Sequence, residues 1–209
     1  MSRIVKIPPP GKTAHPSVKK AAILDAARAR FEKFGFSKVT VDEIAHDIGI
    51  VKGAVYYYFP TKEKIFEDVM REEQAAFMAD IEKMLPRPLT AAKKLGAYIK
   101  IRQQYLQRLE NLGQIDYESW QRIRPNFQEL FQEFEQREIS YLKNILEEGK
   151  SAGEFDVTEP RQHALLLLRT MKGLRLLHAI QRNSPRQEIT DIDHEIHFLT
   201  TVFLAGICR

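Results

Sequence analysis

The sequence predicts an all-α protein of about nine helices. Apolar residues recur at every third or fourth position along most of the chain, and this spacing places them on one face of a helix. Ser, Thr, Gly or Pro stands where one periodic segment gives way to the next, as expected at helix ends. From Pro88 onward no segment alternates with the period of two that a half-buried β-strand requires.

Composition limits the class of protein. The chain has 209 residues, of which 44% are hydrophobic and 29% are charged, enough for one large domain or two small ones. No apolar run is long enough to span a bilayer, and the N-terminal segment lacks the apolar core of a secretory signal. The single cysteine, Cys208, cannot form an internal disulfide, which fits a reducing compartment. We therefore expect a cytoplasmic protein that is not inserted in a membrane.

Charge is distributed unevenly along the chain. Residues 1–64 contain 12 Lys and Arg against 6 Asp and Glu, whereas residues 65–209 contain 20 against 22. A basic N-terminal part attached to a nearly neutral remainder favours a polyanionic partner for that part.

The chain is predicted to begin with a disordered basic arm over residues 1–16, because its four prolines oppose a helix and it has little apolar area to bury. This arm either touches DNA phosphate or is an untethered tail. The first helix then runs from Ser17, its expected N-cap, to Phe34, and Gly35 ends it.

The next stretch, TVDEIAHDIGIVKGAVYYYF, predicts two short helices joined by a tight turn. Thr40 and Glu43 have the spacing of a capping box, and Gly49 supplies the positive φ that lets the first helix end sharply. The second helix turns Val55 and Phe59 inward and leaves a lysine, small residues and three tyrosines outside. A helix this short is not stable alone, and such an outer face suits insertion into a DNA major groove.

Six further helices are predicted from apolar spacing and from the breaks between segments. The break at Pro86 to Pro88 and the pair Asn183-Ser184 followed by Pro185 are the clearest of these. The helices are expected at about 61–85, 95–113, 115–123, 125–151, 158–180 and 190–207.

This order of helices resembles the tetracycline-repressor (TetR) family of bacterial transcriptional regulators. The resemblance is strongest over residues 17–70, and the most specific part is the run Lys52-Gly53-x-x-Tyr56-Tyr57-Tyr58-Phe59-x-x-Lys62-Glu63. It implies a helix-turn-helix DNA-binding domain over 17–64, with its motif at 40–59, followed by an effector-binding and dimerisation domain over 65–209.

The resemblance also implies which residues contact DNA. Lys52 and Gly53 would meet base edges and Ala54 a thymine methyl, while the other residues would bond phosphates. Two positions depart from the family pattern, because Val51 stands where Ser commonly caps the recognition helix and Ala54 where Thr or Ser is common. The predicted DNA-binding residues are Thr40, Lys52, Gly53, Ala54, Tyr56, Tyr57, Tyr58 and Lys62; of the tyrosines, Tyr58 is the one most open to turning inward.

A DNA-binding regulator of this kind is expected to be a homodimer, because one recognition helix contacts only half of a palindromic site in double-stranded DNA. The last two helices are the candidate interface, although this hairpin could instead pack within one chain. The predicted interface residues are Leu166, Gly173, Leu174, Leu177, Leu199, Phe203 and Ile207.

The middle helices are rich in aromatic residues, and in this family such helices enclose a pocket for a small-molecule effector. Most of these aromatics could equally be plain core. An arginine on an apolar helix needs an anionic partner, either an acidic side chain of the chain itself or an acidic ligand. The predicted pocket residues are Tyr105, Trp120, Phe127, Arg175 and His178.

The predicted function is therefore that of a dimeric DNA-binding repressor that an effector releases from its operator. The alternative is a DNA-binding regulator without a ligand, controlled by a protein partner or by abundance. No motif of an enzyme is present, and no cofactor is expected. His194 and His197 stand one turn apart near Asp191 and Asp193, but no further ligand is suitably spaced, so we expect surface polar residues and no metal.

Overall fold

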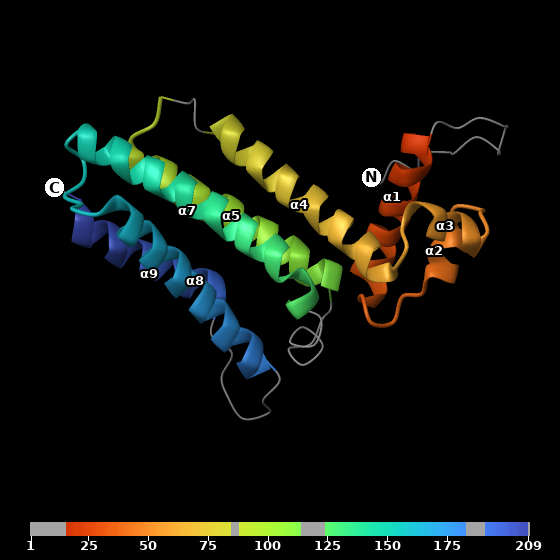
Figure 1. The fold of residues 1–209 in the computed structure, drawn as a ribbon. Helices are drawn as coiled ribbons and strands as arrows, with labels where there is room; N and C mark the ends of the chain where they lie inside the picture. Colours follow the sequence, from red (N-terminus) through yellow and green to blue (C-terminus); the bar gives the residue numbers. More distant parts are fainter. Residues whose placement is uncertain (1–15, 85–87, 114–123, 183–190, 209) are drawn as a thin grey trace. The chain divides into compact units, whose positions relative to one another are not determined.

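The computed structural model of the protein describes residues 16–84, 88–113, 124–182 and 191–208. Within these ranges it contains eight α-helices and one 3-10 helix, and no strand beyond an isolated bridge (Figure 1). The predicted all-α class is confirmed, whereas the count of nine helices is not. The predicted short helix over 115–123 and the predicted arm, apart from Pro16, lie outside the described residues.

The chain forms two compact units. The N-terminal unit extends to Met70 and takes in a short segment that begins at Asn111, and the C-terminal unit contains the remainder. The N-terminal unit holds α1 (Pro16–Phe34), α2 (Val41–Asp47), α3 (Lys52–Tyr58) and the first part of α4 (Lys62–Met84). The C-terminal unit holds the rest of α4, most of α5 (Ala91–Gly113), η1 (Arg124–Phe127), α7 (Gln128–Ser151), α8 (Pro160–Arg182) and α9 (Ile192–Ile207).

Helix α1 begins one residue before the predicted N-cap. Pro16 is already helical, so proline does not oppose the helix at this position. The first helical residue has no intrahelical partner for its N–H and suits the fixed φ of proline, which explains the earlier start. The other end agrees with the sequence, because Phe34 is the last helical residue and Gly35 follows with a φ of +79°.

Three phenylalanine rings make the centre of the N-terminal unit. The ring of Phe66 lies 5.5 Å from that of Phe31 and 4.8 Å from that of Phe36, between centroids. All three side chains are buried, and they come from α1, from the α1–α2 connection and from α4. Aromatic contacts at these separations stabilise beyond the area they bury, so the three segments are held together by this cluster.

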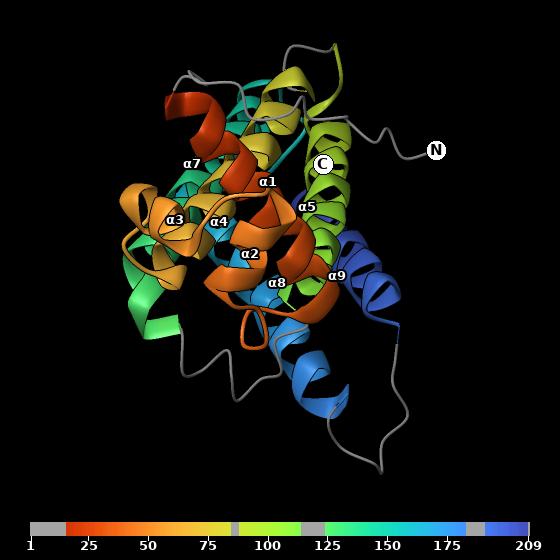
Figure 2. The same ribbon diagram turned by 90° about the vertical axis from the view of Figure 1, so that its right-hand side faces the viewer.

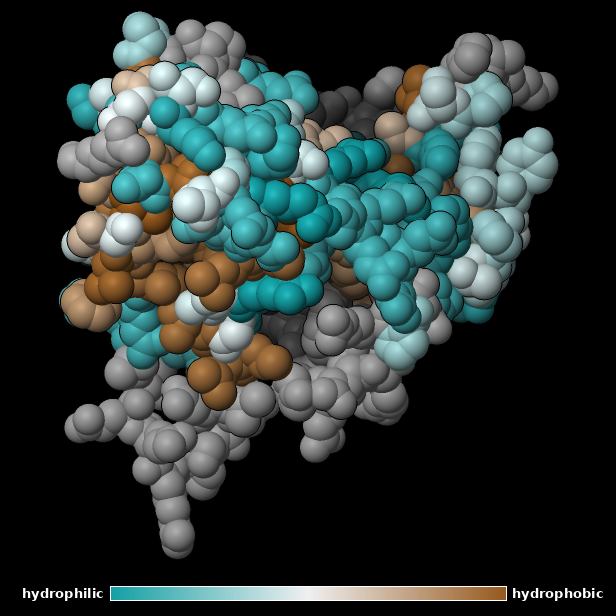
Figure 3. Space-filling model, turned by 60° about the vertical axis from the view of Figure 1, so that its left-hand side comes forward, coloured by the Kyte–Doolittle hydropathy of each residue, from teal (hydrophilic) through white to brown (hydrophobic). Residues whose placement is uncertain are grey.

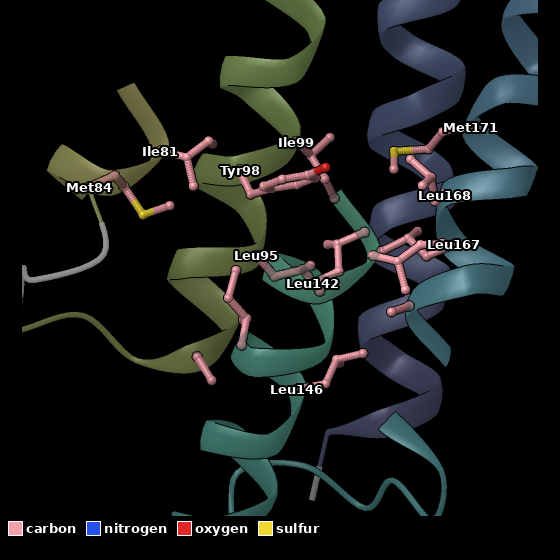
Figure 4. Close-up of a cluster of buried hydrophobic side chains, with 14 of the residues drawn as sticks. Ile81, Met84, Leu95, Tyr98, Ile99, Leu142, Leu146, Leu167, Leu168 and Met171 are labelled. Atoms are coloured by element: carbon pink, nitrogen blue, oxygen red, sulfur yellow. The ribbon is translucent and has the colours of Figure 1, made fainter. Parts of the chain in front are cut away.

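The C-terminal unit is built around aliphatic side chains from α4, α5, α7, α8 and α9. Figure 4 shows side chains of α4 and α5 facing those of α7, which in turn face α8. Its labelled residues are all among the buried core of this unit: Ile81, Met84, Leu95, Tyr98, Ile99, Leu142, Leu146, Leu167, Leu168 and Met171. None of the described helices has the length and the apolar character that crossing a membrane requires.

This core also contains a buried group of polar side chains. The carboxylate of Glu138 on α7 accepts hydrogen bonds from the Tyr98 hydroxyl (2.7 Å) and from Arg102 Nε (2.6 Å) on α5. Burial, and then the neighbouring Glu138 carboxylate, hold the pKa of Tyr98 well above its ordinary value, so its hydroxyl stays protonated and donates. Because breaking a buried ion pair leaves a charge unpaired, this group fixes α5 against α7.

Candidate nucleic-acid interface

The helix-turn-helix forms as the sequence predicts. The Glu43 N–H donates to Thr40 Oγ1 (3.3 Å), and the Thr40 N–H donates to Glu43 Oε2 (2.8 Å), which completes the capping box. These bonds from Thr40 lower the pKa of Glu43, because they stabilise its ionised form. Gly49 has a φ of +66°, a value that glycine adopts without strain and that lets α2 end before α3 begins.

Helix α3 lies beside α2 in the N-terminal unit (Figure 2). Its side chains are buried on one face and exposed on the other. Val55 and Phe59 are fully buried, as predicted. Val51 is the N-cap and makes no side-chain bond to the helix, so α3 lacks the cap that Ser would supply. A Cβ added to Gly53 would meet no atom within 4 Å, so nothing within the described part of the chain explains a glycine there.

The predicted DNA-contacting side chains of α3 are placed differently from one another. Tyr57 is 83% exposed, and Tyr56 is also exposed. Tyr58 is half-buried, and its ring meets that of Tyr57 edge to face at 5.1 Å between centroids. Ala54 is half-buried as well. The hydroxyl groups best placed to reach a DNA backbone are therefore those of Tyr56 and Tyr57.

Lys52, at the start of α3, forms an ion pair with Asp42 of α2. Its Nζ lies 2.7 Å from Asp42 Oδ2, and both side chains are largely exposed. The hydrogen bond that its ammonium donates to this carboxylate raises the pKa of Lys52. Exposed pairs of this kind are weak, so DNA can compete with Asp42 for the ammonium.

Lys62 lies at the start of α4, but its ammonium faces the protein. Its Nζ donates to the carbonyl oxygens of Phe36 (2.9 Å) and Val39 (3.0 Å) in the α1–α2 connection. Burial lowers the pKa of Lys62 below its ordinary value. The sequence did not reveal these contacts, because their acceptors are backbone atoms more than 20 positions away.

A second contact that sequence reasoning missed joins α1 to α2. Arg30 donates through Nε and Nη2 to the two carboxylate oxygens of Asp47, both at 2.6 Å, and lies 3.2 Å from Glu43. A paired fork of this kind fixes the angle between the partners. Arg30 therefore has a structural role, because it orients α2 against α1.

The predicted effector residues lie in the C-terminal unit. The Tyr105 ring is buried, 4.9 Å from Phe77 and 5.5 Å from Phe134 between centroids. Phe127 is buried in the 3-10 helix η1. Arg175 and His178 on α8 are half-buried, and Trp120 lies outside the described residues.

One buried polar group stands near the aromatic cluster. Gln74 is 7% exposed, and its Nε2 has no hydrogen-bond partner in the part of the chain that the structure describes. It lies on α4 one turn before Phe77, whose ring touches Tyr105. An unpaired buried amide is unfavourable unless a water molecule or a ligand accepts its hydrogen bond.

The exposed apolar surface of the C-terminal unit lies on α8 and α9. Figure 3, which brings the left-hand side of Figure 1 forward, shows apolar surface gathered in one area. The exposed large hydrophobic residues of these helices are Leu166, Leu176, Leu177, Phe198 and Val202. Leu166 and Leu177 were predicted at the interface, and they share a stripe of α8 with Gly173. A Cβ added to Gly173 would meet no atom within 4 Å, so this part of the stripe is open.

The residues of α9 that were predicted at the interface face the core of their own unit. Ile207 is only 5% exposed and belongs to the core of its own unit, where its carbonyl accepts a bond from the Asp156 N–H (2.6 Å). Leu199 and Phe203 are half-buried and pack against the same core, as does Leu174 of α8. The most regular apolar stripe of α9 is therefore its inward face. The outward stripe is formed by Phe198 and Val202, whose spacing of four residues was the available signal.

The histidine pair of α9 lies on the surface. His194 and His197 are both exposed. Across the described ranges, no group of three or more His, Cys, Asp or Glu is arranged to hold a metal ion.

Comparison with known proteins relates the segment that contains the helix-turn-helix to one family of regulators. The sequence model for bacterial regulatory proteins of the tetR family matches residues 23–69. The uncharacterized HTH-type transcriptional regulator YhgD of Bacillus subtilis is 26% identical over 155 residues, which cover 72% of this chain and 79% of YhgD. The HTH-type transcriptional repressor Rv1474c of Mycobacterium tuberculosis is 30% identical over 101 residues, which cover 46% of this chain and 54% of that protein.

The similarity to a solved structure extends over nearly the whole chain. The crystal structure of a transcriptional regulator from Cytophaga hutchinsonii superposes with a TM-score of 0.79 at 30% sequence identity. The match covers 91% of this chain and 99% of that one. The likeness therefore includes the C-terminal unit as well as the helix-turn-helix.

Proposed function

This chain belongs to the TetR family of bacterial transcriptional regulators, and from that premise we propose that it represses transcription as a homodimer bound to a palindromic operator. A small-molecule effector in the C-terminal unit would release it. The action would take place in the cytoplasm, where the DNA lies, and would involve no chemical step. Repression is favoured by the relative Rv1474c, which is named as a repressor.

The observation that carries the DNA-binding proposal is the outer face of α3. A lysine and two tyrosines project from a helix whose opposite face is anchored by Val55. Lys52 is suited to guanine O6 and N7, and the tyrosine hydroxyls are suited to phosphate oxygens. Gly53 leaves open space through which a base pair could approach the backbone closely.

The exposed stripes of α8 and α9 support the homodimer. Leu166, Leu177, Phe198 and Val202 offer aliphatic and aromatic area without a side-chain polar atom, which is typical of an obligate interface. Two such hairpins would form a four-helix bundle between subunits and would fix the distance between two copies of α3.

The unpaired amide of Gln74 supports an effector site in the C-terminal unit. A ligand with a hydrogen-bond acceptor beside an apolar or aromatic body would satisfy this amide and pack against Phe77 and Tyr105. Binding would shift the population of α4 between two positions and move the two recognition helices out of register with successive major grooves. To convert a fully bound population to a fully released one, the effector must prefer the released state by roughly ten-thousand-fold.

The DNA-binding proposal is tested by selection of sequences from a random duplex library with the full chain. An enriched inverted repeat is the expected result, since each subunit reads one half-site. If no sequence is enriched and the chain binds all duplexes alike, with an affinity that changes only with salt concentration, then sequence-specific recognition is contradicted.

The effector proposal is tested by thermal shift with a library of metabolites, on the wild type and on Gln74→Leu. The variant removes the unpaired donor, so it should fold normally and lose the shift that a true effector produces. If no compound changes the melting temperature of the wild type or its operator affinity, the alternative of a regulator controlled by a protein partner or by abundance is preferred.

A further inference from the structure

The ammonium of Lys62 joins the first turn of α4 to the α1–α2 connection. It donates to two backbone carbonyl oxygens, those of Phe36 (2.9 Å) and Val39 (3.0 Å). The same group lies 4.3 Å from the centroid of the Phe36 ring. Two of the three N–H donors of Lys62 are thus bonded within the protein, and its ammonium also makes a cation–π contact with the Phe36 ring.

The segment that Lys62 holds leads directly into α2. Phe36 and Val39 are buried, and the Phe36 ring packs on Phe66 of α4 at 4.8 Å between centroids. Neither carbonyl lies in a helix, so neither has an intrahelical donor. Thr40, the residue after Val39, is the N-cap of α2. Lys62 therefore contacts the segment from which α2 begins.

We propose that Lys62 is a positioning residue that fixes the start of α2, and through it the recognition helix, against the first turn of α4, and that it is not a phosphate ligand. The proposal rests on the proposed DNA-binding function. Since α4 continues to Met84 in the C-terminal unit, Lys62 stands where a displacement of this helix would reach the start of α2.

Salt dependence distinguishes the two roles. Each phosphate contact made by a lysine contributes about 0.9 to the slope of log affinity against log salt concentration. We expect Lys62→Met in the full chain to bind a random-sequence duplex on the order of tenfold more weakly, with the slope of the wild type. The measurement is made well below the melting temperature of the variant, so that loss of folded protein does not contribute.

Two variants serve as controls. Lys64→Met removes the same charge from the same turn of α4, where Lys64 pairs with Glu67 and Asp68, and should leave the affinity near that of the wild type. Lys62→Arg retains a charged donor and should recover most of the affinity. Recovery without any change in slope is the result expected of a residue that acts through the α1–α2 connection.

Two measurements do not depend on DNA affinity alone. Amide hydrogen exchange over residues 36–43 should become on the order of tenfold faster in Lys62→Met, because the segment loses its anchor. Carbon-13 NMR of the wild-type lysine should find the pKa of Lys62 below its ordinary value in both the free and the DNA-bound chain, whereas a phosphate contact would raise it on binding.

The proposal is overturned if Lys62→Met lowers the salt slope by about 0.9 per subunit while exchange stays unchanged. It is also overturned if the pKa of Lys62 rises when DNA binds, and this measurement on the wild type decides the matter even if the variant fails to fold. If the wild type does not bind the duplex at all, the DNA-binding proposal fails, and exchange in the free chain still tests the anchoring role.

Discussion

In the part of the chain that the structure describes, two regions each expose three or more large apolar side chains, and they differ in the polar atoms that accompany those side chains. On α3 and its N-cap the exposed residues are Val51, Tyr56 and Tyr57, beside the ammonium of Lys52. On α8 and α9 they are Leu166, Leu176, Leu177, Phe198 and Val202, none of which carries a side-chain polar atom. In the first region the apolar side chains are accompanied by hydrogen-bond donors, whereas the exposed apolar side chains of the second have no polar atom of their own.

The difference supports the two proposed partners, DNA for the first region and a second copy of the chain for the second. Protein–DNA interfaces are wet and polar, and they use tyrosine hydroxyls and lysines to position the backbone. Stable subunit interfaces resemble a protein core and leave few polar groups unpaired. Exposure of apolar residues is therefore an incomplete guide to a surface, and the polar atoms at the ends of the side chains tell which partner it suits.

The largest effect is expected from a charge placed in the second region. Leu177→Glu should weaken the dimer by about 2 kcal/mol or more, roughly 30-fold in dissociation constant, since a carboxylate would be buried between subunits. Sedimentation equilibrium measures the change. Val18→Glu is the matched control, because Val18 is equally exposed on α1. A Leu177→Glu chain that dimerises like the wild type would remove α8 from the interface.

Within the first region, Lys52→Ala should lower operator affinity more than Tyr57→Phe does. Loss of a base contact is worth about 1–3 kcal/mol, so binding to the selected operator should fall about 5- to 150-fold. Binding to random duplex should fall less, because it depends only on charge. Competition between operator and random duplex measures the ratio. An unchanged ratio would assign Lys52 to the phosphate backbone and leave base reading to other residues.

Tyr57→Phe should have a smaller and more uniform effect. The variant keeps the ring and its contact with Tyr58 but removes the hydroxyl that is expected to bond a phosphate. We expect both operator and random duplex to bind about 2- to 10-fold more weakly. Fluorescence anisotropy with each duplex measures this. A loss confined to the operator would mean that Tyr57 reads bases.

The smallest effect is expected on the stability of the helix-turn-helix, from the Glu43 carboxylate in the capping box of α2. The pKa of Glu43 is lowered by its bonds from Thr40, so its contribution to stability is present above its ordinary pKa and is lost as pH falls through the lowered value. Glu43→Gln should therefore reduce stability at neutral pH and flatten its decline below about pH 4.5. Melting temperatures from pH 3 to 6 measure this, with Glu63→Gln as the control. Parallel curves for Glu43→Gln and the wild type would contradict the role of the carboxylate.

The sequence predicted local features of the N-terminal unit well. The capping box, the positive φ of Gly49 and the inward side chains of α3 all follow from residues within a few positions of one another. The helix ends were predicted to within a few residues for the same reason, because caps and breaks are local. The start of α1 differed by one residue, since Pro16 occupies a position where proline is compatible with helix, and α5 begins at Ala91, four residues before the predicted start.

Features that depend on distant parts of the chain were not predicted. The Arg30–Asp47 pair, the carbonyl contacts of Lys62 and the buried Arg102–Glu138 pair all join residues at least 17 positions apart. Periodicity marks an apolar stripe but does not tell which partner covers it. For this reason the stripe of α9 that was predicted at the interface packs against the core of its own unit, and the exposed stripe of Phe198 and Val202 was not predicted.

Binding of DNA by a homodimer is tested directly by a hydroxyl-radical footprint of the selected operator with the wild-type chain and with Leu177→Glu. We expect two protected half-sites related by a twofold axis, with their centres one helical turn of about 34–36 Å, or a multiple of it, apart. With Leu177→Glu this symmetric protection should require a much higher protein concentration, because the variant weakens the dimer that holds the two recognition helices together. A single unsymmetrical footprint for the wild type, or equal protection by both chains at the same concentration, would contradict it.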